Sequence, residues 1–111
     1  MRIECTQQGS VTVVHPRGML AGADADELET RLSELADGDN CDVILEVSGI
    51  IFADSHGLEV LVDAAERLIR DGKTLRLAGE NPKLREVLEL TDLASLFEAH
   101  PTVELAMESC R

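Results

Sequence analysis

The residues of this chain most capable of chemistry stand together in one short turn: Asp54, Ser55, His56 and Gly57. An apolar run precedes the turn, and a helical pattern begins at Leu58. A serine at the N-cap of a helix accepts a hydrogen bond from a free backbone N–H group, a contribution of about 1 kcal/mol. The pattern therefore predicts that Ser55 caps a helix, while Gly57 permits the close approach of another backbone segment.

The same position favours a phosphate group on the Ser55 hydroxyl. A helix N-terminus offers free N–H groups and the positive end of the helix dipole, both of which stabilise an anion. Phosphorylation adds roughly 1.5 to 2 negative charges, and a partner protein lying over the turn meets them as new charge and bulk. The turn thus predicts a binding switch that can release a partner while the domain stays folded.

Ser55 and His56 could also be read as a nucleophile and its base. Consecutive residues entering a helix point in different directions, and no third residue that would orient the imidazole is identifiable. The sequence has no phosphate loop of the Gly-x-x-x-x-Gly-Lys type and no His or Cys residues at metal-ligand spacing. We therefore expect no enzymatic activity, no catalytic residue, no metal and no cofactor.

Patterned segments on both sides of the turn predict strands. Ile3 to Thr6 and Val11 to His15 predict a hairpin around the turn residues 7–10. Asp42 to Val47 is short and rich in branched residues, which is typical of a central strand covered on both faces. Lys73 to Ala78 predicts a further strand.

Apolar residues at three- and four-residue steps predict four helices. The first has Asp24 as its N-cap and ends at Gly38, and the second runs from the Ser55 turn to Asp71-Gly72. The third begins at Asn81-Pro82 and continues through Leu90, and a short one follows Pro101. The expected fold class is α/β: one domain over residues 1–111, with a mixed sheet of four to five strands and about four helices packed against it.

Composition excludes several classes of protein. The net charge of −12 repels a phosphate backbone, and the only aromatic residues are two phenylalanines, so nucleic acid is not an expected partner. No segment approaches the ~18 apolar residues of a membrane helix, and the N-terminus does not resemble a signal peptide, which predicts a cytoplasmic protein without membrane insertion. An acidic stretch over residues 24–39 is interpreted as a solvated helix face, with a basic partner surface as the alternative.

The cysteines Cys5, Cys41 and Cys110 are odd in number and far apart. They predict free thiols in a reducing compartment.

Four segments resemble the STAS domain family of bacterial anti-sigma factor antagonists. Phe52-Ala53-Asp54-Ser55-His56-Gly57-Leu58 is similar to the family signature Asp-Ser-Ser/Thr-Gly-Leu. Arg17 to Leu20 resembles its Gly-x-Leu-Asp segment, Leu77 to Arg85 its Gly-x-x-Pro-x-Val-Arg stretch, and Leu90 to Phe97 its Thr-Gly-Leu-x-x-Leu-Phe stretch. The segments occur in the family's order over nearly the whole chain.

This resemblance implies a phosphorylation cycle. An anti-sigma factor with serine-kinase activity phosphorylates such a domain, a metal-dependent serine phosphatase reverses the reaction, and the unphosphorylated form binds the anti-sigma factor and frees the sigma factor. By position Ser55 matches the phosphoacceptor, Asp54 the carboxylate before it, and Gly57 and Leu58 the helix start. The implied partner-binding residues are Asp54, Ser55, His56, Gly57 and Leu58. The oligomeric state stays open.

Three residues depart from the family pattern. His56 stands where the family usually has Ser or Thr, and its imidazole either pairs with the phosphate when protonated or points outward and alters the choice of partner. Ala21 replaces an Asp, which removes one expected partner contact. Asp92 replaces a Gly, and because Asp tolerates left-handed backbone, we expect it to end a helix there.

A second interpretation keeps the STAS fold but places it outside sigma control. The chain would then be an accessory subunit of a phospholipid-transport ABC system, or a scaffold in a signalling array. The partner distinguishes these interpretations: a serine kinase and phosphatase for the switch, and a transporter ATPase for the accessory subunit.

Overall fold

The computed structural model describes residues 1–38 and 42–110, and in this part of the chain it confirms the α/β class. The sheet has six strands, slightly more than expected. In chain order the elements are β1 (Arg2–Gln8), β2 (Val11–Leu20), α1 (Gly22–Asp37), β3 (Asp42–Glu46), β4 (Ile50–Ala53), α2 (Ser55–Arg70), β5 (Arg76–Ala78), α3 (Pro82–Leu90), the 3-10 turn η1 (Ala94–Leu96), β6 (Glu98–His100) and α4 (Val103–Ser109).

The sheet is mixed, as predicted. Its main order is β1-β2-β3-β5-β6, in which β1 is antiparallel to β2 and the remaining pairs are parallel. The long strand β2 pairs twice: its first part, from Val11 to Val14, pairs β3, and its last part, from Gly18 to Leu20, pairs β4. The strand expected to be central, β3, lies in the middle of the order.

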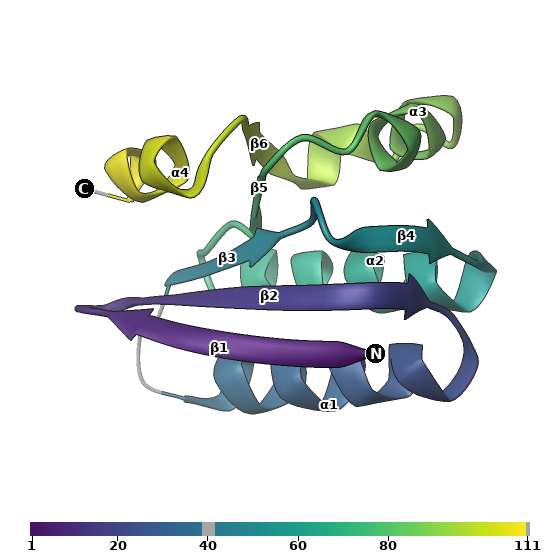
Figure 1. The fold of residues 1–111 in the computed structure, drawn as a ribbon. Coiled ribbons are helices and arrows are strands. Elements are labelled where there is room, and N and C mark those ends of the chain that lie inside the picture. Colours follow the sequence, from purple (N-terminus) through teal and green to yellow (C-terminus); the bar gives the residue numbers. More distant parts are fainter. Residues whose placement is uncertain (39–41, 111) are drawn as a thin grey trace.

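Helices cover both faces of the sheet. Figure 1 shows α1 and α2 side by side. The buried residues Leu84 and Leu88 of α3 belong to the same core as these two helices, whereas α4 packs on the other face. Fully buried Leu28 and Leu61 anchor α1 and α2 in the main core, where burying a leucine stabilises the fold by roughly 1.5 to 3 kcal/mol. On the opposite face Ala106 of α4 packs with a second buried cluster of Val11, Val13, Ile44 and Ala78. Both faces of β3 are therefore covered, as predicted.

Two strands were not predicted, and one is shorter than expected. β4 and β6 have four and three residues, too few for an alternating pattern to be recognised. The segment 73–75 was assigned to a strand, but the Lys73 N–H group donates to the Leu68 carbonyl at 2.7 Å and closes the end of α2. Pairing with β3 begins only at Arg76.

The helix ends give a mixed result. The predicted ends at Gly38 and Asp71 are confirmed, as are the start at Asn81 and the left-handed Asp92, whose φ is 62°. The prediction that Asp24 caps α1 is wrong, because the helix begins at Gly22 and Asp24 lies in its first turn. Gly22 has a φ of 54°, which glycine adopts readily, so the chain turns from β2 directly into α1.

Cys5 is exposed and Cys110 is half-buried, and both are free thiols, as expected. The prediction for Cys41 lies outside the described residues. None of the helices in the described ranges is long and apolar enough to span a membrane.

Candidate functional site

The predicted site lies where the carboxyl ends of β2 and β4 meet, on the right of Figure 1. The two strands are parallel, with Leu20 opposite Ala53 at their ends. The Asp54 N–H group extends this pairing by donating to the Leu20 carbonyl at 3.2 Å. The turn that carries Ser55 is therefore fixed to the sheet by backbone pairing up to the residue before it.

Asp54, and not Ser55, is the N-cap of α2. Its Oδ1 atom accepts from the Gly57 N–H group at 2.7 Å, and its backbone is extended. The prediction that Ser55 caps the helix is thus wrong: Ser55 is the first helical residue. An aspartate immediately before the serine is a charged acceptor at the position that the strand pairing already fixes, and such a cap contributes about 1 kcal/mol.

Asp54 also contacts the start of α1. Its Oδ2 atom lies 3.4 Å from the Gly22 nitrogen, a long contact compared with the one to Gly57. Ala21, at the N-cap of α1, has no side-chain acceptor. The carboxylate of Asp54 thus contacts the N-termini of two helices, and Ala21 lies directly beside the predicted site.

Gly57 is buried in the first turn of α2 and packs on β2. A Cβ atom at this position would lie 2.1 Å from the Leu20 carbonyl oxygen and 2.9 Å from the Leu20 Cγ atom. No side chain fits there without moving the helix away from the sheet. The sequence-based prediction of a close backbone approach at Gly57 is confirmed.

Ser55 is exposed, because Asp54 supplies the cap and the serine hydroxyl is not needed for it. It stands at the positive end of a 16-residue helix. Leu58, one turn on, is half-buried against the main core, and its N–H group donates to the Asp54 carbonyl at 3.0 Å. The predicted site residues are therefore brought together, but only some of their side chains face solvent.

The His56 imidazole crosses from α2 to α1. Its Nε2 atom lies 2.6 Å from Oδ1 of Asp26, and its Nδ1 atom lies 3.7 Å from Oε2 of Glu59. The hydrogen bond to Asp26 is the main cause of a raised pKa for His56, with smaller contributions from Glu59 and from the charge of Asp54. The sequence could not reveal the contact with Asp26, because the helical patterns around Asp26 and around His56 do not show that these residues, 30 positions apart, lie close together.

Apolar side chains are exposed beside the turn. Met19 and Phe52 pair across β2 and β4, and each is 51% exposed. Phe52 and Ile51 also line a hollow of about 340 Å³ between β4 and α3, with Val87 and Leu90 on the other side. Sequence reasoning interpreted these β4 residues only as an apolar segment before the turn and missed the exposed surface. The apolar run at residues 50–53 was the feature that could have indicated it.

Comparison with known proteins finds similar sequences and similar structures. The STAS domain family matches residues 2–106 of the chain. BtrV of Bordetella bronchiseptica, which is named as an anti-sigma factor antagonist, is 29% identical over 90 residues, or 81% of this chain and 78% of BtrV.

Solved structures have the same fold. A protein of Thermotoga maritima described as an anti-sigma factor antagonist superposes with a TM-score of 0.87 at 25% identity, covering 96% of this chain and 92% of that one. The Bacillus cell fate determinant SpoIIAA, solved in its phosphorylated form, gives a TM-score of 0.78 at 17% identity and covers 99% and 100% of the two chains. Domains of this fold thus include one that carries a phosphate.

Proposed function

The chain belongs to the STAS domain family, and from this premise we propose that it is an anti-sigma factor antagonist whose binding is controlled by phosphorylation of Ser55. In this proposal an anti-sigma factor with serine-kinase activity is both the partner and the kinase. A serine phosphatase restores the binding form. The relatives named as anti-sigma factor antagonists support the class of partner.

The observation that carries the proposal is the exposed Ser55 hydroxyl at the first position of α2. Because Asp54 caps the helix, phosphorylation of Ser55 removes no capping hydrogen bond. A phosphate at this position gains from the helix dipole. The domain can therefore accept the modification and remain folded, while a partner that covers the turn meets about two new negative charges.

The surface around Ser55 is suited to a protein partner. Met19 and Phe52 expose apolar surface on the neighbouring strands β2 and β4, and contiguous exposed apolar surface commonly marks a protein contact. Asp54, His56, Gly57 and Leu58 lie in or directly under the same surface. In this proposal a partner that covers Phe52 also covers Ser55, so a phosphate on Ser55 weakens the binding of that partner.

We also propose that the protein acts by binding and not by catalysis. The imidazole of His56 is engaged with Asp26 and Glu59, both carboxylates, and not with the Ser55 hydroxyl. A serine nucleophile needs a base within hydrogen-bond reach. The neighbours of His56 therefore support a charged contact in place of a base for Ser55.

The test is phosphorylation and binding with the cognate partner. Incubation with the source cell's anti-sigma kinase and ATP is expected to add one phosphate, at Ser55, as located by mass spectrometry. Ser55→Ala should keep the affinity for the anti-sigma factor, whereas Ser55→Asp should weaken it at least about tenfold, or 1.4 kcal/mol. Ser95→Asp, at another exposed serine, is the control for added charge.

Three results would contradict the switch. A phosphate found only at other residues would remove Ser55 from the mechanism. Equal affinities of the Ala and Asp variants would indicate a constitutive scaffold, and recovery with a transporter ATPase in place of a kinase would indicate the accessory subunit.

A further inference from the structure

His56 joins the phosphoacceptor turn to α1 by a contact that the binding switch does not require. The imidazole is 41% exposed and the Asp26 side chain is 65% exposed, so the 2.6 Å contact between Nε2 and Oδ1 forms at the surface. A serine or threonine at this position, as in the family signature that the turn resembles, has no group that ionises near neutral pH. This chain therefore has a titratable group directly beside its phosphoacceptor.

Within residues 1–38 and 42–110, the charged groups recorded against His56 are acidic. Asp26 approaches from α1, Glu59 from the next turn of α2, and Asp54 from the turn itself. The N-terminal ammonium of Met1 forms an ion pair with Asp24 of α1, at a distance of 3.0 Å. His56 thus lies among three carboxylates, an arrangement that favours its protonated form.

A phosphate on Ser55 would enlarge this negative cluster by roughly two charges on the neighbouring residue. The phosphate would lie at the N-terminus of α2, on the residue that follows the N-cap Asp54. A protonated imidazole is the cation nearest in sequence that can offset it, either in place at Asp26 or by turning toward the phosphate.

We infer that His56 couples proton binding to the phosphorylation state of Ser55: protonation of the imidazole stabilises the phosphoserine form, and phosphorylation favours protonation of the imidazole. The two effects are equal by thermodynamic linkage. The inference rests on the proposed function, in that it assigns a pH dependence to the same site. The phosphorylated, partner-free form is then favoured as the pH falls through the titration range of His56.

The first experiment follows the imidazole by NMR in the full chain labelled with ¹⁵N. Phosphoserine is placed at position 55 during translation, so no kinase is needed. The expected result is a rise in the His56 titration midpoint of about half a pH unit or more on phosphorylation. His15, which pairs with Glu4 across β2 and β1, and His100, which contacts Glu98, serve as internal references.

Two substitutions separate the contribution of Asp26. In the unphosphorylated chain, Asp26→Asn should lower the His56 midpoint, since the main partner of the imidazolium loses its charge. Glu27→Gln, one residue along α1 and exposed, is the matched control and should leave the midpoint within about 0.2 pH units.

The reciprocal measurement uses the phosphate. In ³¹P NMR the second ionisation of phosphoserine 55 should occur at lower pH in the parent chain than in His56→Asn, because the imidazolium favours the dianion. Equal ³¹P midpoints in these two chains, together with a His56 midpoint that phosphorylation does not move, would overturn the inference. A kinase that never phosphorylates Ser55 would overturn the proposed function instead, and these measurements would be unaffected.

Discussion

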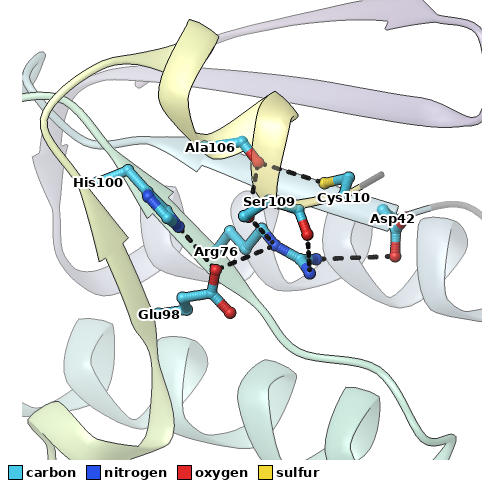
Figure 2. A network of polar contacts seen from close by, with 7 residues as sticks. All are labelled: Asp42, Arg76, Glu98, His100, Ala106, Ser109 and Cys110. Atoms are coloured by element: carbon cyan, nitrogen blue, oxygen red, sulfur yellow. Dashed lines mark hydrogen bonds and ion pairs between the residues drawn. The ribbon is translucent and has the colours of Figure 1, made fainter.

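Two polar clusters, next to different strands of the sheet, contain similar residues but have different roles. The first is the Ser55 turn, at the carboxyl ends of β2 and β4. The second is the Arg76 network, defined as Asp42, Arg76, Glu98, His100, Ser109 and Cys110, with the Ala106 carbonyl (Figure 2). Both contain a histidine–carboxylate contact of almost the same length, 2.6 Å for His56 and Asp26 and 2.7 Å for His100 and Glu98.

The clusters differ in how their polar groups are satisfied. Figure 2 shows the guanidinium of Arg76 directed into the network, where it is 13% exposed and donates from Nε to the Ser109 Oγ atom at 2.7 Å. Asp42 and Glu98 lie 3.7 and 3.5 Å from its nitrogens. These contacts fasten α4 to β3, β5 and β6, and they leave few side chains for a ligand.

The Ser55 turn meets its structural needs with Asp54 and the backbone. That leaves Ser55 exposed and His56 bonded only at the surface. Burial, more than residue type, therefore separates a cluster that holds the fold from one that can take part in binding.

The largest expected effect comes from the one buried member of the turn. Gly57→Ala places a methyl group 2.1 Å from the Leu20 carbonyl oxygen, and we expect it to lower the free energy of unfolding by about 3 kcal/mol. Urea unfolding measures this. Gly38→Ala is the control, because a Cβ atom there lies at an ordinary 3.4 Å from the Leu35 carbonyl oxygen. Equal stability of the two variants would show that α2 does not need its close contact with β2.

Arg76→Met tests whether the other cluster is structural. It removes the donor shared by Ser109, Glu98 and Asp42, and we expect a loss of about 2 kcal/mol. Arg85→Met, at an exposed position of α3, should change stability by less than about 0.5 kcal/mol.

The alkylation rate of Cys110 is a second measurement on Arg76→Met. Burial is the main cause of its raised pKa, so its thiol should be alkylated slowly compared with exposed Cys5 in the parent chain. Detachment of α4 in Arg76→Met should speed alkylation of Cys110 alone, as mapped by mass spectrometry. An unchanged rate and unchanged stability would contradict a structural role for the network.

Most of the fold followed from local patterns in the sequence. Leu28 and Leu32 in α1, and Leu61 and Leu68 in α2, recur at helical spacing and are buried as that spacing predicts. Asn81-Pro82 marks the start of α3. What failed depended on pairing between distant segments. β6 exists because Leu77 pairs with Ala99, and its three residues carry no signal of their own.

The site divides in the same way. The turn was found because Asp54, Ser55 and Gly57 are consecutive or nearly so. The roles of the residues within the turn could not be predicted in this way. The choice between Asp54 and Ser55 as the N-cap depends on the hydrogen bond from the Asp54 N–H group to the Leu20 carbonyl on β2. The Asp26 contact and the exposed Met19–Phe52 pair likewise arise only when the strands and helices are assembled.

The smallest expected effect distinguishes the two histidine–carboxylate contacts by the sign of their pH dependence. The hydrogen bond from His100 is the main cause that lowers the pKa of Glu98, with further contributions from Ser109 and Arg76. A carboxyl group whose pKa is lowered in the folded state contributes stability at pH values above its unfolded pKa, near 4.5. This contribution is lost as the pH falls through the folded pKa. The raised pKa of His56 acts in the opposite direction: its contribution is complete below 6.5 and is lost as the pH rises through the folded value.

Glu98→Gln and Asp26→Asn should therefore lower the free energy of unfolding in different pH ranges. Because Glu98 is 40% exposed, solvent screening limits the cost of Glu98→Gln to less than about 1 kcal/mol near neutral pH, and the cost should shrink toward pH 3. Asp26→Asn should cost most near pH 6 and least above pH 8, since only the imidazolium attracts Asp26 strongly. Urea unfolding across this range measures both, with Glu66→Gln as an exposed control on α2. If the cost of Glu98→Gln were independent of pH, the carboxylate would have no special partner in the folded state, and the Arg76 network would be held by Arg76 and Ser109 without it.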